Sequence, residues 1–192
     1  MSQLKLTADG GGGTVSLKGP STTTGNAAIE LTVPGTGSAT VDTLKRSGNI
    51  LQVVNTLKTS SFTTTSTDVS SSPRGVEVTG LTASITPSSA SNKILVRVTF
   101  GLTNSNQNYY AHSFLYRGTT LLGTSTSMGH GGGVGLQSHS IERLDSPNTT
   151  SSITYSMRLA AEGNTAKIGQ GSSGSDDEKA DDATITLMEV AA

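Results

Sequence analysis

The chain has 192 residues, of which 32% are hydrophobic, 4% aromatic and 14% charged, with no cysteine and a formal net charge of −1. The lack of cysteine excludes disulfides and thiolate metal sites, and the lack of a basic excess argues against nucleic-acid binding. No apolar run approaches the ~18 residues of a membrane span, so no membrane insertion is expected. Disordered chains combine few apolar residues with high net charge. This chain has only the first trait, and we expect it to fold.

Residues 1–48 are rich in Gly, Ser and Thr and contain short stretches in which apolar and polar residues alternate. Such alternation is typical of half-buried strands, expected here at residues 14–18, 28–33 and 39–42. Turn-forming residues separate these stretches. The region carries too little apolar surface to fold alone, so the sequence predicts an attachment segment over residues 1–48.

Residues 49–192 carry the stronger pattern. No segment shows a sustained helical period, whereas short alternating stretches separated by turn residues are typical of a sandwich, jelly roll or barrel. The expected strands are residues 50–57, 76–81, 83–86, 93–102, 109–117, 121–123, 151–159 and 183–190. We therefore predict an all-β chain whose residues 49–192 form an antiparallel, jelly-roll-like β-sandwich. Its first strand, 50–57, should pair with its last, 183–190.

Several short segments resemble virion structural proteins of tailed phages, especially phages of marine and cyanobacterial hosts. Near the start these segments are residues 13–20 and 29–34. Further along they are residues 50–54, Leu81, 84–89, 92–96, 117–119, 144–147 and 185–189. The resemblance covers most of the chain, and the order and spacing of several of these segments match. The resemblance implies a homotrimeric β-sandwich on the particle exterior, at the end of a fibre or spike or on the capsid.

Two functions follow as expectations. The first is a short trimeric tail fibre or spike that binds a host-surface glycan or protein and joins other virion proteins through residues 1–48. The second is a capsid or tail decoration protein that cements the particle, with the same segment as its anchor. A carbohydrate-binding module without a structural role is a third, weaker alternative.

The best candidates for receptor contact are Asn106, Asn108, Tyr109 and Tyr110. Tyr and Asn offer amphipathic contact area and hydrogen bonds, as binding loops do, although one Tyr could instead pack inward at the start of a strand. We expect contact through three loops, at residues 104–110, 123–139 and 169–182.

Asp176, Asp177, Asp181 and Asp182 belong to the densest charge cluster in the sequence. Several carboxylates in one loop could hold Ca²⁺, but the spaced pattern of a calcium loop is missing and Lys179 interrupts the cluster. A solvated loop is the better interpretation.

Three histidines, His112, His130 and His139, could repeat around a three-fold axis and bind a metal, but no His-x-His pair is present. Ordinary loop or strand histidines are the better interpretation. The sequence has no Gly-x-Ser-x-Gly elbow and no phosphate-binding loop. We therefore expect neither enzymatic activity nor a cofactor.

Overall fold

A computed structural model describes residues 4–7, 14–17, 47–129, 136–169 and 182–192. The chain divides into two compact units, residues 1–43 and 44–192. In the first unit, β1 (Leu4–Thr7) pairs with β2 (Thr14–Leu17) in an antiparallel hairpin. The strand predicted at 14–18 is confirmed, and those predicted at 28–33 and 39–42 lie outside the described residues. The attachment role of residues 1–48 stays a prediction.

All regular structure described in the second unit is β. Its strands are β3 (Ile50–Lys58), β4 (Phe62–Thr64), β5 (Val76–Ile85), β6 (Lys93–Asn104), β7 (Tyr110–Arg117), β8 (Thr120–Met128), β9 (Gln137–Asp145), β10 (Ile153–Ala161), β11 (Ala166–Ile168) and β12 (Ala183–Val190). Since the described part of the chain contains no helix, none of its segments forms a helix that could cross a membrane.

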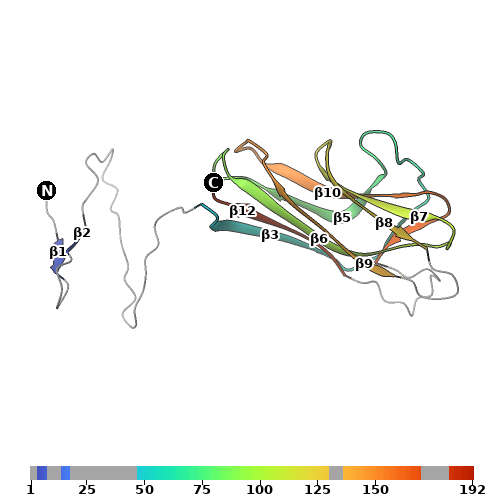
Figure 1. The fold of residues 1–192 in the computed structure, drawn as a ribbon, viewed down its shortest axis with the longest axis horizontal. Helices are drawn as coiled ribbons and strands as arrows, with labels where there is room; N and C mark the ends of the chain where they lie inside the picture. The colour runs from blue at the N-terminus through green and yellow to red at the C-terminus, as the bar shows by residue number, and fades with distance from the viewer. Residues whose placement is uncertain (1–3, 8–13, 18–46, 130–135, 170–181) are drawn as a thin grey trace. The chain divides into compact units, whose positions relative to one another are not determined.

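The strands form two antiparallel sheets (Figure 1). The first sheet has the order β3-β12-β6, with β9 on the other edge of β6, and the short β11 and β4 extend it beyond the end of β12. The second sheet has the order β5-β10-β7-β8. Leaving out β4 and β11, the eight main strands pair first with eighth, second with seventh, third with sixth and fourth with fifth.

This pairing is that of a hairpin of four strand pairs rolled up so that successive pairs enter alternate sheets, which is the jelly roll. The predicted all-β, antiparallel sandwich is therefore confirmed. The predicted pairing of the first and last strands is also confirmed, with Lys58 opposite Ala183 and Val54 opposite Leu187.

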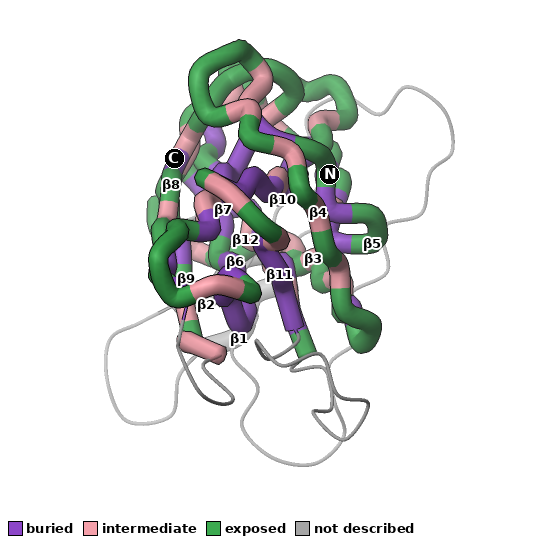
Figure 2. Tube along the Cα trace, turned by 90° about the vertical axis from the view of Figure 1, so that its right-hand side faces the viewer, coloured by how far each residue is buried: buried purple, intermediate pink, exposed green. Residues whose placement is uncertain are grey.

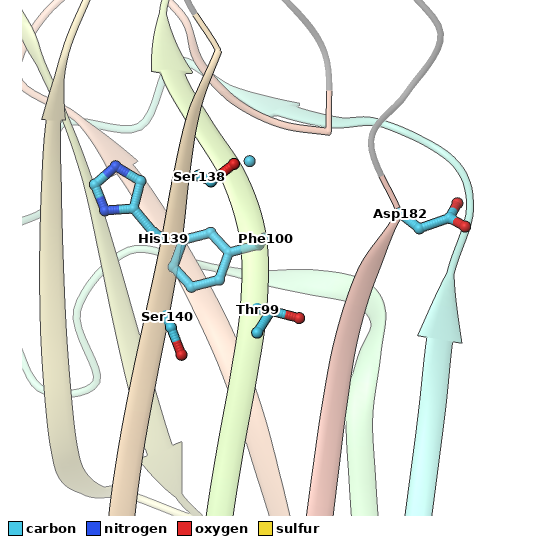
Figure 3. A pocket seen from close by; sticks show the side chains of 7 residues that line it. Thr99, Phe100, Ser138, His139, Ser140 and Asp182 are labelled. Atoms are coloured by element: carbon cyan, nitrogen blue, oxygen red, sulfur yellow. The ribbon is translucent and has the colours of Figure 1, made fainter.

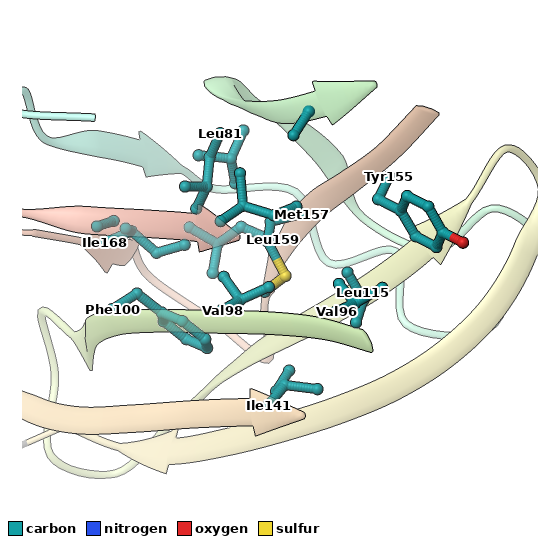
Figure 4. Close-up of a cluster of buried hydrophobic side chains, with 14 of the residues drawn as sticks. Leu81, Val96, Val98, Phe100, Leu115, Ile141, Tyr155, Met157, Leu159 and Ile168 are labelled. Carbon is teal, nitrogen blue, oxygen red and sulfur yellow. The ribbon is translucent and has the colours of Figure 1, made fainter. Parts of the chain in front are cut away.

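The core lies between the two sheets and is built by alternation along each strand. In β6, Ile94, Val96 and Val98 are fully buried while the residues between them face outward. Met157 and Leu159 of β10 meet them from the second sheet (Figure 4). Seen from one end, buried segments gather inside and exposed segments lie in the outer connections (Figure 2). The alternation that predicted the strands is thus the alternation that fills the core.

The prediction of one contact loop over residues 123–139 is wrong, because most of its described residues belong to two strands. Residues 123–128 belong to β8, and residues 137–139 begin β9. The inward positions of β8 carry Gly123, Ser125 and Ser127, small residues suited to an edge strand. Because both strands lack the apolar alternation used to find strands, they were mistaken for a loop.

Candidate functional site

The strand directions sort the connections of the sandwich into two ends. At one end, the backbone N–H of Gly48 donates to Ala191 O at 2.8 Å, which places the entry of the chain into the sandwich beside its last strand. We call this the proximal end (Figure 1). At the opposite, distal end, the connections between β6 and β7 and between β10 and β11 meet. The segments joining β8 to β9 and β11 to β12 also start and finish there.

The side chain of Asn104 anchors the distal loop, which we define as residues 104–110. Asn104 is fully buried at the end of β6, and its Nδ2 donates to Tyr110 O at 3.1 Å and to Gly163 O at 2.9 Å. Its Oδ1 accepts from the backbone N–H of Asn106 at 3.0 Å. One amide therefore fixes both ends of the loop and joins it to the β10–β11 turn.

Further hydrogen bonds leave the loop little freedom. Asn106 Oδ1 accepts from the N–H of Asn108 at 2.9 Å, and Asn106 O accepts from the N–H of Tyr109 at 3.2 Å. The N–H of Tyr110 donates to the Glu162 carboxylate at 3.1 Å, and the N–H of Glu162 donates back to Tyr110 O at 2.9 Å. The loop is therefore held in one shape before any partner arrives, which lowers the entropy lost on binding.

The predicted contact residues lie together on this loop. Tyr109 is 37% exposed and Tyr110 38% exposed, Asn108 is exposed and Asn106 half-buried. The Tyr109 ring lies against Gly163, where a Cβ would come within 2.7 Å of it. The Tyr110 ring lies 6.2 Å from the His112 ring on the outer face of the second sheet. Neither tyrosine is buried, so the alternative that one of them packs inward at the start of the strand is wrong. Whether the four residues bind a receptor stays a prediction.

Gly129 is packed directly beneath the distal loop. Its N–H donates to Tyr109 O at 3.1 Å, and a Cβ at this position would overlap the carbonyl of Asn106 and lie 2.7 Å from Asn104 O. We expect Gly129→Ala to push the loop outward and to lower the free energy of unfolding by about 1–3 kcal/mol, the usual cost of overpacking. Thermal unfolding with near-ultraviolet dichroism of the tyrosines would measure both effects. Gly118→Ala, at a turn with open space around it, is the comparison; its cost should come from its positive φ alone, without a tyrosine signal.

The cation candidates fall largely outside the described residues, which include Asp182 but not Asp176, Asp177 or Asp181. Asp182 is exposed and borders an open hollow of about 370 Å³ between the ends of β6, β9 and β12, together with Thr99, Ser138 and Ser140. Its carboxylate points away from the ring of His139 (Figure 3). Within the described ranges, no three His, Asp or Glu side chains come together as a metal site would require.

Two of the three histidines are described, and they face different surroundings; His130 lies outside the described residues. His112 Nδ1 lies 3.4 Å from Thr126 Oγ1, and His139 Nδ1 lies 2.6 Å from Ser125 Oγ. Burial lowers the pKa of both imidazoles, with the Glu162 carboxylate acting in the opposite direction on His112. Among the described side chains, Nε2 of His139 is buried without a hydrogen-bond partner, and its ring stacks on Phe100 with centroids 5.9 Å apart. Both rings are therefore expected to be neutral at pH 7.

No protein-family model matches the chain, and no curated protein matches it. Among solved structures, it is similar to VP2 of infectious bursal disease virus in a subviral particle, with 11% identity, a TM-score of 0.39, and coverage of 73% of this chain and 37% of that one. The structure of the Gt strain of the same virus gives 16% identity, a TM-score of 0.34, and coverage of 97% and 46%. The chain thus spans less than half the length of either. The fold stated above rests on strand pairing within this chain.

Proposed function

We propose that this chain is a virion structural protein, displayed on the particle exterior as a short trimeric tail fibre or spike of a tailed phage. In this proposal, residues 1–48 join it to other virion proteins, and the distal loop contacts a host-surface glycan or protein. The observation that carries the proposal is the separation of the two ends. The chain enters the sandwich at the proximal end, while its exposed tyrosines and amides are held in a fixed loop at the other.

Three further points support the proposal. Jelly rolls recur in viral capsid and lectin domains, although a fold alone does not define a function. Of the sequence segments that resemble phage virion proteins, those beyond residue 48 lie on β3, β5, β6, β7, β9 and β12 and on turns of this sandwich. Tyr and Asn on a preorganised loop provide contact area and hydrogen bonds at a low cost in entropy. The homotrimer and the absence of enzymatic activity belong to the proposal.

The proposal predicts that the exposed tyrosines dominate binding to permissive host cells. Tyr109→Ala and Tyr110→Ala should each lower retention of the purified full-length protein on such cells by ~10-fold or more, because central aromatic residues carry most of the energy of a protein contact. Leu121→Ala is the matched control: Leu121 is 37% exposed but lies at the proximal end of β8, and its truncation should leave retention unchanged. A flow-cytometric titration with labelled protein measures the effect.

Decoration of the capsid is the alternative outcome. Suppose the wild-type protein does not bind permissive cells but binds capsids from which it has been stripped. The proposal of host attachment is then wrong, and capsid decoration is the function. The copy number per purified particle separates the two independently. A count comparable to that of the major capsid protein indicates decoration, and a small count indicates the tail.

A further inference from the structure

The outer faces of the two sheets differ in how they are covered. On the second sheet, Phe114 and Tyr116 point outward and are buried, and Arg74 of the connection between β4 and β5 contacts both of them. In this connection, the N–H of Arg74 donates to Tyr116 Oη at 2.9 Å, and the Arg74 guanidinium lies 6.0 Å from the centre of the Phe114 ring. The chain thus covers the apolar part of that face with its own connection.

The outer face of the first sheet carries an apolar band that remains open to solvent. One row crosses all four main strands in register, from Val53 through Met188 and Leu95 to Leu144. A second, adjacent row adds Ile50 and Val190. We call these six residues the outer apolar band. Val53, Leu144 and Ile50 are 57%, 54% and 56% exposed, and the other three are half-buried. A contiguous patch of this kind marks an interaction surface more often than a solvated one.

We infer that the outer apolar band is a contact surface between copies of this chain. The inference rests on the part of the proposed function in which copies associate, and it names one face that they use; because the band meets the same band of a copy, this contact is two-fold and adds to the trimer contact without replacing it. Charge favours a second copy as the partner. The next row holds one cation, Arg97, directly opposite one anion, Glu142, and both side chains are exposed. A copy presents the same pair, so Arg97 and Glu142 can each meet an opposite charge, and a net charge of −1 adds almost no repulsion. One further exposed cation, Lys93, lies beside Val190 at the margin of the band.

The rest of the row that holds the charged pair, and the row after it, also suit a contact surface. Asn55 Nδ2 donates to Thr186 Oγ1 at 2.8 Å, and the hydroxyls of Thr99 and Thr184 lie 2.7 Å apart. These polar groups already have partners within the sheet. Covering them therefore leaves few buried groups unsatisfied, which is the usual cost of placing a polar surface in an interface.

The size of the face is close to that of a small specific contact. Four strands at a spacing of ~4.8 Å give a width of roughly 19 Å, and the stretch from Ile50 to Leu57 at ~3.3 Å per residue gives a length of roughly 23 Å. Counted as flat areas, two such faces in contact bury roughly 900 Å², and the projecting side chains add to this area. A specific interface buries about 1,000 Å² in total. The contact is therefore small, and association through it is expected to be weak and concentration-dependent.

The test is the molar mass of the full-length protein in solution, measured by light scattering across roughly 1–100 μM, where such an interface should assemble. The wild-type protein should be oligomeric. Val53→Lys and Leu144→Lys should each weaken association by ~10-fold or more, because a lysine in the band places an unpaired charge in the contact. Both positions are more than half exposed, so the fold should tolerate the change, as the thermal midpoint will show.

The matched control is Leu121→Lys, which places the same charge at an exposed leucine on the second sheet and should leave the mass unchanged. A monomeric wild-type protein, an oligomer unaffected by both band variants, or equal dissociation by the control would each overturn the inference. A monomer that still binds host cells through the distal loop would overturn it while leaving host attachment in place.

Discussion

Glu189→Ala is expected to lower the free energy of unfolding by roughly 3 kcal/mol at pH 7. Glu189 lies on β12 with only 1% of its surface exposed, and its carboxylate accepts four hydrogen bonds. Asn92 Nδ2, the Ser88 N–H and the Ser88 hydroxyl donate to Oε1 at 2.6, 2.6 and 2.8 Å, and Gln52 Nε2 donates to Oε2 at 2.6 Å. Removing the carboxylate leaves buried donors without an acceptor, which costs more than the hydrogen bonds themselves contribute.

The same carboxylate makes stability depend on pH. Burial alone would raise the pKa of Glu189, but the hydrogen bonds from Asn92, Gln52 and Ser88 outweigh it and lower the pKa from 4.5 to about 2. A lowered pKa stabilises the fold above the unfolded value of 4.5, and this contribution is lost as the pH falls towards 2. The difference amounts to roughly 3 kcal/mol.

Urea denaturation at a series of pH values from neutral down to pH ~2 measures both effects. The wild-type protein should lose this stability as the pH falls, whereas Glu189→Ala should be less stable at neutral pH and lose less with acid, so that the two approach each other near pH ~2. Glu142→Gln, which removes an exposed carboxylate, is the control and should change stability by no more than ~0.5 kcal/mol. If Glu189→Ala matched the control, the hydrogen-bond network would not stabilise the proximal end as described.

Asp145→Ala is expected to cost about 3 kcal/mol, because it breaks a link between the two sheets. Asp145 ends β9 in the first sheet and is 10% exposed. Its Oδ2 accepts from Arg117 Nη1 of β7 at 2.7 Å and from Tyr155 Oη of β10 at 2.8 Å, both in the second sheet. Burial and the neighbouring carboxylate raise the pKa of Tyr155, so its hydroxyl remains a donor. The variant leaves a partly buried guanidinium and a buried hydroxyl unpaired, and orphaned buried charges are costly.

A double-mutant cycle separates the two parts of that cost. Arg117→Met in the Asp145→Ala background should recover most of the lost stability, since it removes the orphaned charge and leaves an apolar side chain in its place. Tyr155→Phe alone should cost only about 1 kcal/mol, the usual worth of one hydrogen bond. Equal instability of the single and double variants would show that the loss comes from packing and not from the unpaired guanidinium.

The sequence was informative where apolar alternation fills the core and uninformative for two of the edge strands, β8 and β9. The stretch KILVRVTFGL predicted β6, and ATITLMEV predicted both β12 and its pairing with β3. In β9 the core side of the strand contributes a single buried hydrophobic residue, Ile141, and in β8 small residues take the inward positions. The edge strands β8 and β9 face the core with small or polar groups, so hydrophobicity could not reveal them, whereas the edge strands β3 and β5 were predicted from their apolar residues.

The candidate site was predicted in part. Tyr109 and Tyr110 were singled out by residue type and proved to be exposed, but the residue that positions them, Asn104, was missed. Its signal was present: an amide at the end of an apolar strand, just before a turn, must find partners when buried. Glu189 carried a similar signal, because it takes the inward phase of Ile185 and Leu187. In both cases, the partners come from segments distant in sequence, which no local pattern could identify.

The pairing of β3 with β12 also bears on how the domain forms. The first and last strands of the sandwich are neighbours, so the first sheet lacks its β12 strand, which joins β3 to β6, until residues 183–190 have been synthesised. Native contacts of such long sequence separation are typical of slow, all-or-none folding. On the ribosome, the sandwich can close only after translation of β12, at the end of the domain. A prematurely terminated chain would therefore present unpaired edges of β3 and β6 and not a finished domain.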